Sequence, residues 1–394
     1  MRVLRRTVQL AFLGLTVAVG LGAAMGWLQG ASVEGYCPMG GLAALPSAIT
    51  TQRFSCSTGE ANFTALAGLL VLALLARKSF CAWLCPLGTL LEWLGRLGAR
   101  LRGRRAASPA VGLLAPARAP DRLARWLRLG VLAAIVAATY TTSELVFRPY
   151  CPYYSLTSFH GHDVEAWSYA ILGTVLLAAL VLPMAWCRYL CPLGGALWPF
   201  ARLGRLRVAR EESACTGCGK CDRACPHGLR PSAADEVRSG ECTLCLECRA
   251  ACPERGALGV RAGALGARPR VSAWAVPGLL GGLAVLVVVA SGLWSMPSYA
   301  LDIPDAAPAA RPAVVSLVVD GVRCVDTARK AVAQLERLPG VIRVVAYAAR
   351  HTLEVHHDGA RLDREAIRRA LEAPVIDPQS GQIRFHVYKV LEIE

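Results

Sequence analysis

The sequence predicts a mainly α-helical membrane protein that carries an inserted cysteine-rich domain and a C-terminal α+β domain. Three observations support this fold class. The 394 residues are 54% hydrophobic and only 18% charged, whereas soluble domains average about 25% charged residues. Five apolar stretches approach the ~20 residues that a helix needs to cross a bilayer. Twelve of the 16 cysteines are gathered in short clusters, which makes cysteine chemistry central to the function.

Five transmembrane helices account for the apolar stretches. The predicted spans are Thr7–Leu28, Ala61–Ala76, Trp126–Phe147, Ala166–Ala185 and Ala273–Met296. The first span has a basic start, as a cleaved signal peptide has, but its removal would destroy the internal repeat described below. It is therefore interpreted as a retained transmembrane helix of a multi-pass protein.

The basic residues are distributed asymmetrically about these spans. Twenty-eight Lys and Arg residues lie in the N-terminal segment and in the loops after the second and fourth spans, whereas the other two loops contain only Arg53 and Arg148. Because loops rich in Lys and Arg stay in the cytoplasm, the N-terminus is predicted to be cytoplasmic and the C-terminus periplasmic. This asymmetry explains the net charge of +15 and excludes a nucleic-acid-binding protein.

An internal repeat organises residues 1–205. Each half, about 1–105 and 120–205, contains a span, an outer Tyr-Cys-Pro, a second span and an inner Cys-x3-Cys-Pro-Leu-Gly. The inner cysteines are Cys81, Cys85, Cys187 and Cys191, and the outer cysteines are Cys37 and Cys151. Cysteines four residues apart share one helix face, so four sulfur atoms are expected to meet at the inner end. The inner cysteines could act as redox-active dithiols or as ligands of a metal or an iron–sulfur cluster. The two outer cysteines could form a disulfide, an electron relay or a pair of ligands.

The strongest signal lies in residues 206–262. Two runs share the spacing Cys-x2-Cys-x2-Cys-x3-Cys-Pro, and the fourth cysteine of such a run ligates the other cluster. One [4Fe–4S] cluster is assigned to Cys215, Cys218, Cys221 and Cys252, and a second to Cys242, Cys245, Cys248 and Cys225. Zinc ribbons use pairs of cysteines rather than runs of four, and disulfides are disfavoured in the cytoplasm. The segment is therefore predicted to be a bacterial-type two-cluster ferredoxin domain.

Residues 1–296 resemble the membrane-bound ferredoxin-type proteins of the NapH, NosR and CcoG kind. The resemblance rests on the two Cys-x3-Cys-Pro motifs and on the paired cysteine runs that follow them. It implies electron transfer at or across the bacterial inner membrane. The implied partners are electron-donor and electron-acceptor proteins or a quinol.

Residues 313–394 follow the fifth span and an Ala/Pro-rich linker at 297–312, and they are predicted to be periplasmic. Their alternating and helical periodicities give the order βαββαβ, a ferredoxin-like fold. Cys324 and Thr327 belong to the stretch 321–327, at the start of the first predicted helix. This domain resembles the heavy-metal-associated domains of copper transport, whose loop carries two cysteines. Since two thiolates are what selects Cu(I), the resemblance implies a degenerate domain in which Cys324 binds metal weakly.

The favoured hypothesis is an inner-membrane iron–sulfur electron-transfer protein, acting as an oxidoreductase component. It would pass electrons from a cytoplasmic or quinol donor to a membrane or periplasmic acceptor, in copper reduction or in the maturation of a metalloenzyme. Its cofactors would be two [4Fe–4S] clusters. Whether it also binds an additional intramembrane cluster or metal, or copper, is left open by the sequence. One alternative is a quinol-oxidising subunit of a periplasmic reductase system. The other is a non-catalytic assembly or regulatory factor that senses redox state and binds a periplasmic metalloprotein.

Overall fold

The computed structural model describes residues 1–25, 27, 36–50, 58–103, 119–142, 145–158, 164–262, 269–293, 297–303, 310–322, 325–376, 383–385 and 388–393. Within these residues the chain forms two compact units. The first unit comprises 1–34, 64–137 and 146–290, and it holds most of the helical bundle and the cysteine-rich domain. The second comprises 35–63, 138–145 and 291–394 and holds the C-terminal sheet.

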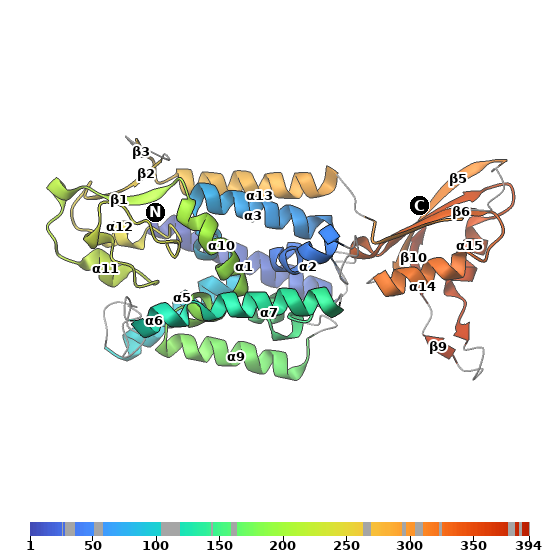
Figure 1. Cartoon of the computed structure of the whole chain (residues 1–394), viewed down its shortest axis with the longest axis horizontal. Coiled ribbons are helices and arrows are strands. Elements are labelled where there is room, and N and C mark those ends of the chain that lie inside the picture. Colours follow the sequence, from blue (N-terminus) through green and yellow to red (C-terminus); the bar gives the residue numbers. More distant parts are fainter. Residues whose placement is uncertain are drawn as a thin grey trace. The chain divides into compact units, whose positions relative to one another are not determined.

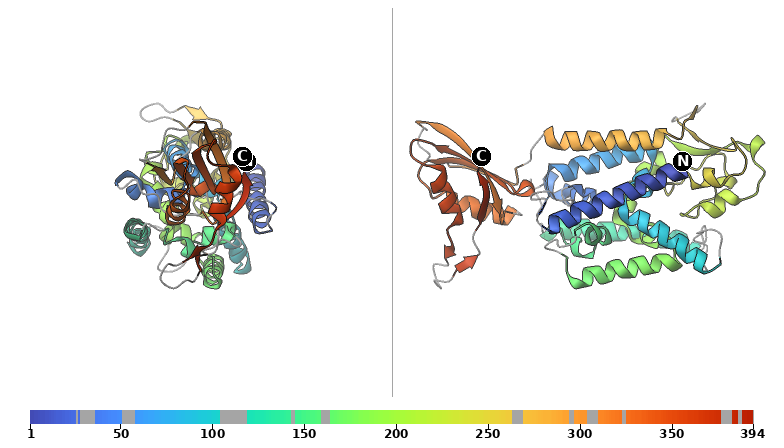
Figure 2. Two further views of the ribbon diagram at one scale, coloured as in Figure 1. Left: turned by 90° about the vertical axis from the view of Figure 1, so that its right-hand side faces the viewer. Right: turned by 180° about the vertical axis from the view of Figure 1, so that it is seen from behind.

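Five apolar helices occupy the five predicted spans. They are α1 (Arg2–Ala24), α3 (Glu60–Ala76), α7 (Leu127–Thr142), α9 (Ala166–Val181) and α13 (Ala275–Leu293). Their axes run roughly parallel in the bundle (Figures 1 and 2). Among the described residues only α1, over Arg2–Gly22, and α13 are long and apolar enough to cross a membrane by themselves, whereas α3, α7 and α9 are shorter apolar helices. Two candidate membrane helices are thus established, and the full set of five spans remains a prediction.

Short helices that begin at a Cys-Pro pair make the repeat visible in the fold. They are α2 (Pro38–Thr50), α5 (Pro86–Leu101), α8 (Pro152–Thr157) and α10 (Pro192–Leu203). Proline suits the first turn of a helix because the N–H group there has no partner within the helix. The remaining short elements of the bundle are α4 (Ser79–Trp83), α6 (Ala119–Ala124), the 3-10 turn η3 (Arg148–Tyr150) and the π-helical turn η4 (Trp186–Leu190).

Helix α5 packs against α9 at very short range. A Cβ atom at Gly98 would overlap the carbonyl oxygen of Leu180 in α9, and one at Gly95 would lie 2.8 Å from Cβ of Pro183, just after α9. Only glycine fits at Gly98, where backbone meets backbone, and a side chain at Gly95 would press on the ring of Pro183. The two glycines therefore allow α5 to pack closely against the C-terminal end of α9.

Replacing Gly98 with alanine should destabilise the bundle by about 1–3 kcal/mol, the usual cost of overpacking. The matched control is Gly173→Ala in α9, where the added Cβ meets no heavy atom within 4 Å and alanine gains up to ~1 kcal/mol of helix propensity. Thermal unfolding in detergent, followed by tryptophan fluorescence, measures both. Equal transition temperatures for the two variants would contradict the packing described here.

The cysteine-rich domain is built around two similar turns of helix. Helix α11 (Lys220–Ala224) starts after Gly219 and α12 (Glu247–Ala251) after Leu246, and both preceding residues have left-handed backbone, with φ of 63° and 59°. Each helix carries the third cysteine of its run, and the fourth cysteine is its C-cap. A three-stranded antiparallel sheet of β1 (Arg207–Arg210), β2 (Leu258–Arg261) and β3 (Arg270–Val271) closes the domain, with 3-10 turns η5 (Glu212–Ala214) and η6 (Pro231–Ala233).

The C-terminal domain is a five-stranded antiparallel sheet of order β10-β5-β7-β6-β4. Its elements are β4 (Tyr299–Asp302), β5 (Pro312–Asp320), α14 (Val325–Leu335), β6 (Val341–Tyr347), the 3-10 turn η7 (Ala348–Arg350), β7 (Thr352–Asp358), α15 (Arg364–Glu372), β8 (Val375–Ile376), β9 (Ile383–Phe385) and β10 (Lys389–Ile393). The strands β5, β6, β7 and β10 with the two helices have the predicted βαββαβ order. Their arrangement in the sheet is that of a ferredoxin-like fold.

Two details of this domain differ from the prediction. The segment 297–312 is expected to be a linker, but its residues Tyr299–Asp302 form β4 and pair with β6, which covers an otherwise unpaired sheet edge. Alternation over 383–390 predicts a single last strand, whereas the last strand of the sheet is Lys389–Ile393 and Ile383–Phe385 pairs with Val375–Ile376 in a small two-stranded sheet. Hydrophobic periodicity alone does not distinguish which of two neighbouring apolar segments joins the main sheet.

Candidate metal centres

The first cysteine run lines one cavity together with the last cysteine of the second run. Cys215, Cys218, Cys221 and Cys252 all face this cavity, and Arg210, Thr216, Gly219, Ser232, Glu254, Ala257 and Leu258 complete its lining. Cys218 is exposed, whereas Cys221 is buried. The fold therefore brings together the four cysteines that the crossed spacing assigns to one cluster, and it leaves one edge of that group open to solvent.

The second group is more deeply buried. Cys225 and Cys248 lie within electrostatic range of each other and of Cys242 and Cys245, so the last cysteine of the first run joins the second run. The side chains of Cys225, Cys242 and Cys248 are each 8% exposed. The backbone N–H of Leu229 donates to Sγ of Cys225 at 3.3 Å, a bond that stabilises a thiolate.

The chemistry of both groups fits iron–sulfur clusters. Burial raises the pKa of Cys225 to about 12 and that of Cys245 to about 11, so these thiols become thiolates when a bound cation supplies compensating charge. Within the described residues, no three His, Cys, Asp or Glu side chains stand close enough to share one metal ion. A cubane does not require such a group, because each of its four thiolates binds a different iron.

The four inner cysteines of the repeat also converge. Cys187 lies within electrostatic range of Cys81, Cys85 and Cys191, and Cys85 within range of Cys81 and Cys191. Two repeat halves therefore contribute two cysteines each to one place in the bundle. This meeting is what the duplicated Cys-x3-Cys spacing predicts.

Cys85 and Cys191 have equivalent surroundings. Each is the N-cap of a helix that begins with proline, α5 and α10 respectively, and each Sγ accepts a hydrogen bond from the backbone N–H three residues later, at 3.4 Å from Gly88 and from Gly194. The N-terminus of a helix favours a negative charge. The backbone N–H bonds at both sulfur atoms favour the thiolate form that a metal ligand requires, whereas burial of the two cysteines opposes it.

Buried charges lie near both the inner cysteines and the second run. Lys78 Nζ is 3.3 Å from Oε2 of Glu241, and Arg128 donates to the same oxygen at 2.9 Å. Burial by itself would raise the pKa of Glu241, but Lys78 and Arg128 lower it to about 2. Glu241 precedes Cys242, and Lys78 lies within electrostatic range of Cys81 and Cys191. The ion-pair group of Lys78, Arg128 and Glu241 is therefore close to both the inner cysteines and the second run.

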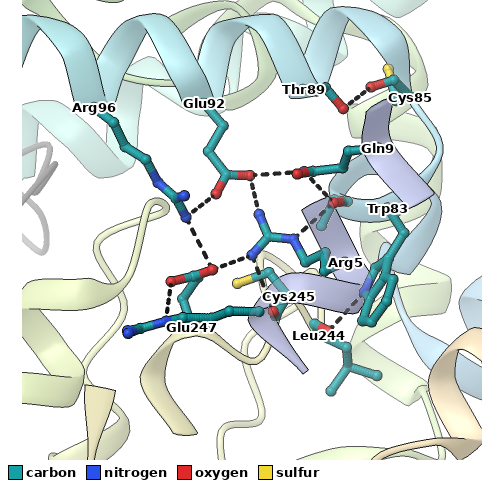
Figure 3. A network of polar contacts seen from close by, with 12 residues as sticks. Arg5, Gln9, Trp83, Cys85, Thr89, Glu92, Arg96, Leu244, Cys245 and Glu247 are labelled. Atoms are coloured by element: carbon teal, nitrogen blue, oxygen red, sulfur yellow. Dashed lines mark hydrogen bonds and ion pairs between the residues drawn. The ribbon is translucent and has the colours of Figure 1, made fainter. Parts of the chain in front are cut away.

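A second polar network joins the start of α1 to the cysteine-rich domain (Figure 3). Arg5 is ion-paired with Glu92 of α5 and with Glu247 of α12. Arg96 bridges the same two carboxylates, at 2.6 Å from Glu92 and 3.0 Å from Glu247. Gln9 donates to the carbonyl of Ala82 at 2.9 Å. The N-terminal turns of α1 are therefore part of the site.

The other candidate cysteines are distributed over the two units. Cys151 is the N-cap of α8, and its Sγ accepts no N-cap hydrogen bond. Cys37 lies immediately before α2, and its carbonyl accepts a hydrogen bond from Nδ2 of Asn62 at 3.0 Å. The two belong to different units, so the predicted pairing of these outer cysteines remains a prediction. Cys324 lies outside the described residues.

Sequence reasoning missed the charged residues that surround the cysteines. Glu241 and Glu247 each directly precede a cysteine of the second run, and Arg5 and Gln9 are polar residues at the start of an apolar span. Charged and polar groups are rarely fully buried without a partner. That placement is the signal that could have identified them.

Comparison with known proteins supports the iron–sulfur interpretation. A family described as a 4Fe-4S binding domain matches residues 58–105 and 166–210, and a 4Fe-4S dicluster domain matches residues 207–256. The first match covers the two repeat motifs, and the second covers both cysteine runs. No solved structure matches the chain.

Three relatives illustrate the similarity. The YccM protein of Escherichia coli strain K12, whose name links it to electron transport, is 32% identical over 223 residues, which are 56% of this chain and 61% of the relative. An uncharacterised protein of Methanocaldococcus jannaschii is 31% identical over 184 residues, 47% of this chain and 72% of the relative. The ferredoxin-type protein NapH of Haemophilus influenzae is 26% identical over 200 residues, 48% of this chain and 63% of the relative.

Converging cysteine runs beside a helical bundle define an iron–sulfur protein. The chain belongs to the family of 4Fe-4S ferredoxin-type proteins. The matched segment spans about three fifths of the Escherichia coli and Haemophilus relatives, and none of the three matches extends over the whole of this chain. The likeness of the C-terminal domain to heavy-metal-associated domains finds no support in these comparisons.

Proposed function

We propose that this protein transfers electrons across the bacterial inner membrane, from a reductant on the cytoplasmic side to an acceptor at the outer face. The observation that carries the proposal is the interleaving of the two cysteine runs, because Cys252 lies at the cavity of the first run and Cys225 lies among the cysteines of the second. Interleaved runs are typical of two-cluster ferredoxins. The names of related proteins, electron transport protein and ferredoxin-type protein, are consistent with this role.

Each cysteine group has a distinct task in this proposal. Cys215, Cys218, Cys221 and Cys252 hold the cluster nearest to solvent, and Cys242, Cys245, Cys248 and Cys225 hold the buried one. Cys81, Cys85, Cys187 and Cys191 ligate a further metal or iron–sulfur group within the bundle. When bound, such groups accept and release single electrons. The protein supplies their ligands, excludes water from the buried groups and balances their charge with Lys78 and Arg128.

A ligand role for the inner cysteines is favoured over a pair of redox dithiols. Four cysteines converge rather than two separate pairs, and two of the sulfur atoms accept N–H bonds at helix N-termini. The match of the repeat segments to a 4Fe-4S binding domain points in the same direction. The outer cysteines, Cys37 and Cys151, are then the candidates for contact with the acceptor.

The proposed topology places five helices across the membrane with the N-terminus inside. The distribution of Lys and Arg supports it, as do the apolar helices in all five spans. A periplasmic reporter fused after Glu394 should be active, and a cytoplasmic reporter inserted between Cys225 and Cys242 should also be active. A cytoplasmic C-terminus would mean that one of the short helices does not cross, and it would remove the argument for an outer acceptor.

A further inference from the structure

The first Cys-x3-Cys motif and the second cysteine run are joined by a direct hydrogen bond (Figure 3). Trp83, inside the Cys81–Cys85 motif, donates its indole Nε1–H to the carbonyl of Leu244, inside the Cys242–Cys248 run, at 3.2 Å. Trp83 is fully buried, so this carbonyl replaces water as the acceptor for its polar edge. The left-handed backbone of Leu244, at φ 47°, belongs to the turn that presents the carbonyl.

Arg5 forms a second connection between the same two segments. Its Nε donates to the carbonyl of Ala82 at 3.1 Å, and its Nη1 donates to the carbonyl of Cys245 at 3.2 Å. One guanidinium group thus bonds to the backbone of both cysteine segments. Its charge is balanced by Glu92 and Glu247, and its side chain is 3% exposed. A buried arginine with these partners keeps a single geometry, because the N–H donors of its planar guanidinium group have fixed directions.

We propose that Trp83 and Arg5 are positioning residues that couple the iron–sulfur group of the second run to the metal group held by the four inner cysteines. The inference rests on the proposed function and adds its internal route. Electron exchange weakens steeply with distance and is favoured by continuous bonded paths. Both connections are such paths, and each ends within one or two residues of a cysteine on either side.

The coupled exchange moves one electron. The group at the second run is oxidised by one electron and the group at the inner cysteines is reduced by one, while no covalent bond forms or breaks and no proton is transferred. The first run does not take part in this contact, and its exposed Cys218 suits it for electron exchange with the cytoplasmic reductant. The contacts of Trp83 and Arg5 therefore imply an order of electron transfer from the first run to the second run and then to the inner cysteines.

The decisive variant is Trp83→Phe, which keeps an aromatic ring and removes the N–H donor. Its matched control is Trp126→Phe, because Trp126 is 62% exposed and contacts Trp198 rather than a cysteine segment. Full-length protein is purified anaerobically, and iron content, EPR spectra of the reduced state and the internal transfer rate after rapid reduction are measured. We expect unchanged iron in both variants. Only Trp83→Phe should show weaker magnetic interaction between the two groups and a several-fold slower transfer.

A second pair of variants keeps the inference testable if Trp83→Phe loses iron. Arg5→Lys retains the charge but cannot bond to both carbonyls, and the control Arg6→Lys alters an exposed arginine. Slower internal transfer in Arg5→Lys alone supports the coupling role. Wild-type magnetic interaction and transfer rate in Arg5→Lys, or in an iron-replete Trp83→Phe, overturn it. Wild-type protein without any metal group at the inner cysteines would instead refute the proposed function on which the inference depends.

Discussion

Cys225→Ser should remove the iron bound by the second run and leave the iron bound by the first. Although Cys225 belongs to the first run in sequence, it lies among Cys242, Cys245 and Cys248, so its loss deprives the buried group of a ligand. Anaerobically purified wild-type protein should contain about eight iron and about eight sulfide in this domain, and the variant about half. EPR spectra of the reduced protein identify which group remains.

Cys252→Ser is the reciprocal test. It should empty the solvent-facing group, whose cavity Cys252 lines, and leave the buried one intact. The two variants must therefore lose different EPR signals. If each variant instead loses the signal of its own run, the ligands do not cross, and the assignment of Cys225 and Cys252 is wrong.

Cys191→Ser should abolish reduction of an acceptor on the outer side while both groups of the ferredoxin domain stay reducible. Cys191 is one of four converging cysteines, and serine is a poor ligand for iron, so the group within the bundle should be lost. Cys85→Ser should behave in the same way, because the two residues occupy equivalent N-cap positions. Turnover with a periplasmic acceptor and iron content together measure the effect.

The outcomes of these two variants separate the possible roles of the inner cysteines. Loss of iron beyond the ferredoxin-domain content indicates a metal group at the inner cysteines. Unchanged iron with loss of thiol–disulfide conversion would show that they are redox dithiols, which contradicts the ligand assignment. Full turnover in both variants would contradict an electron route through the bundle.

Local motifs allowed much of the site to be predicted. The spacing of the two runs predicts which cysteines share a cluster. The short turns that bring the cysteines of one run together, such as the one through Gly219, are formed by neighbouring residues and can therefore be recognised in the sequence. The repeat predicts that Cys81, Cys85, Cys187 and Cys191 meet. The places of the apolar helices and the βαββαβ order also follow from periodicity.

Contacts between distant segments could not be predicted in this way. Arg5 bonds to Cys245 across 240 positions of the chain, and no local pattern specifies that partner. The close approach of Gly98 to Leu180 is likewise set by how two helices pack. Strand β4 joins the sheet because β6 presents an open edge, and that edge exists only once the domain has folded. The apolar helices α7 and α9 are shorter than the predicted spans Trp126–Phe147 and Ala166–Ala185.

The most direct test of the account is electron transfer into closed vesicles. The full-length protein is reconstituted so that the cysteine-rich domain faces outward, a membrane-impermeant low-potential reductant is added outside, and an electron acceptor is enclosed within. The account predicts that the enclosed acceptor is reduced at a rate that depends on the wild-type protein and falls to the protein-free level with Cys191→Ser. Reduction of the ferredoxin-domain iron without reduction of the enclosed acceptor would contradict transmembrane electron transfer.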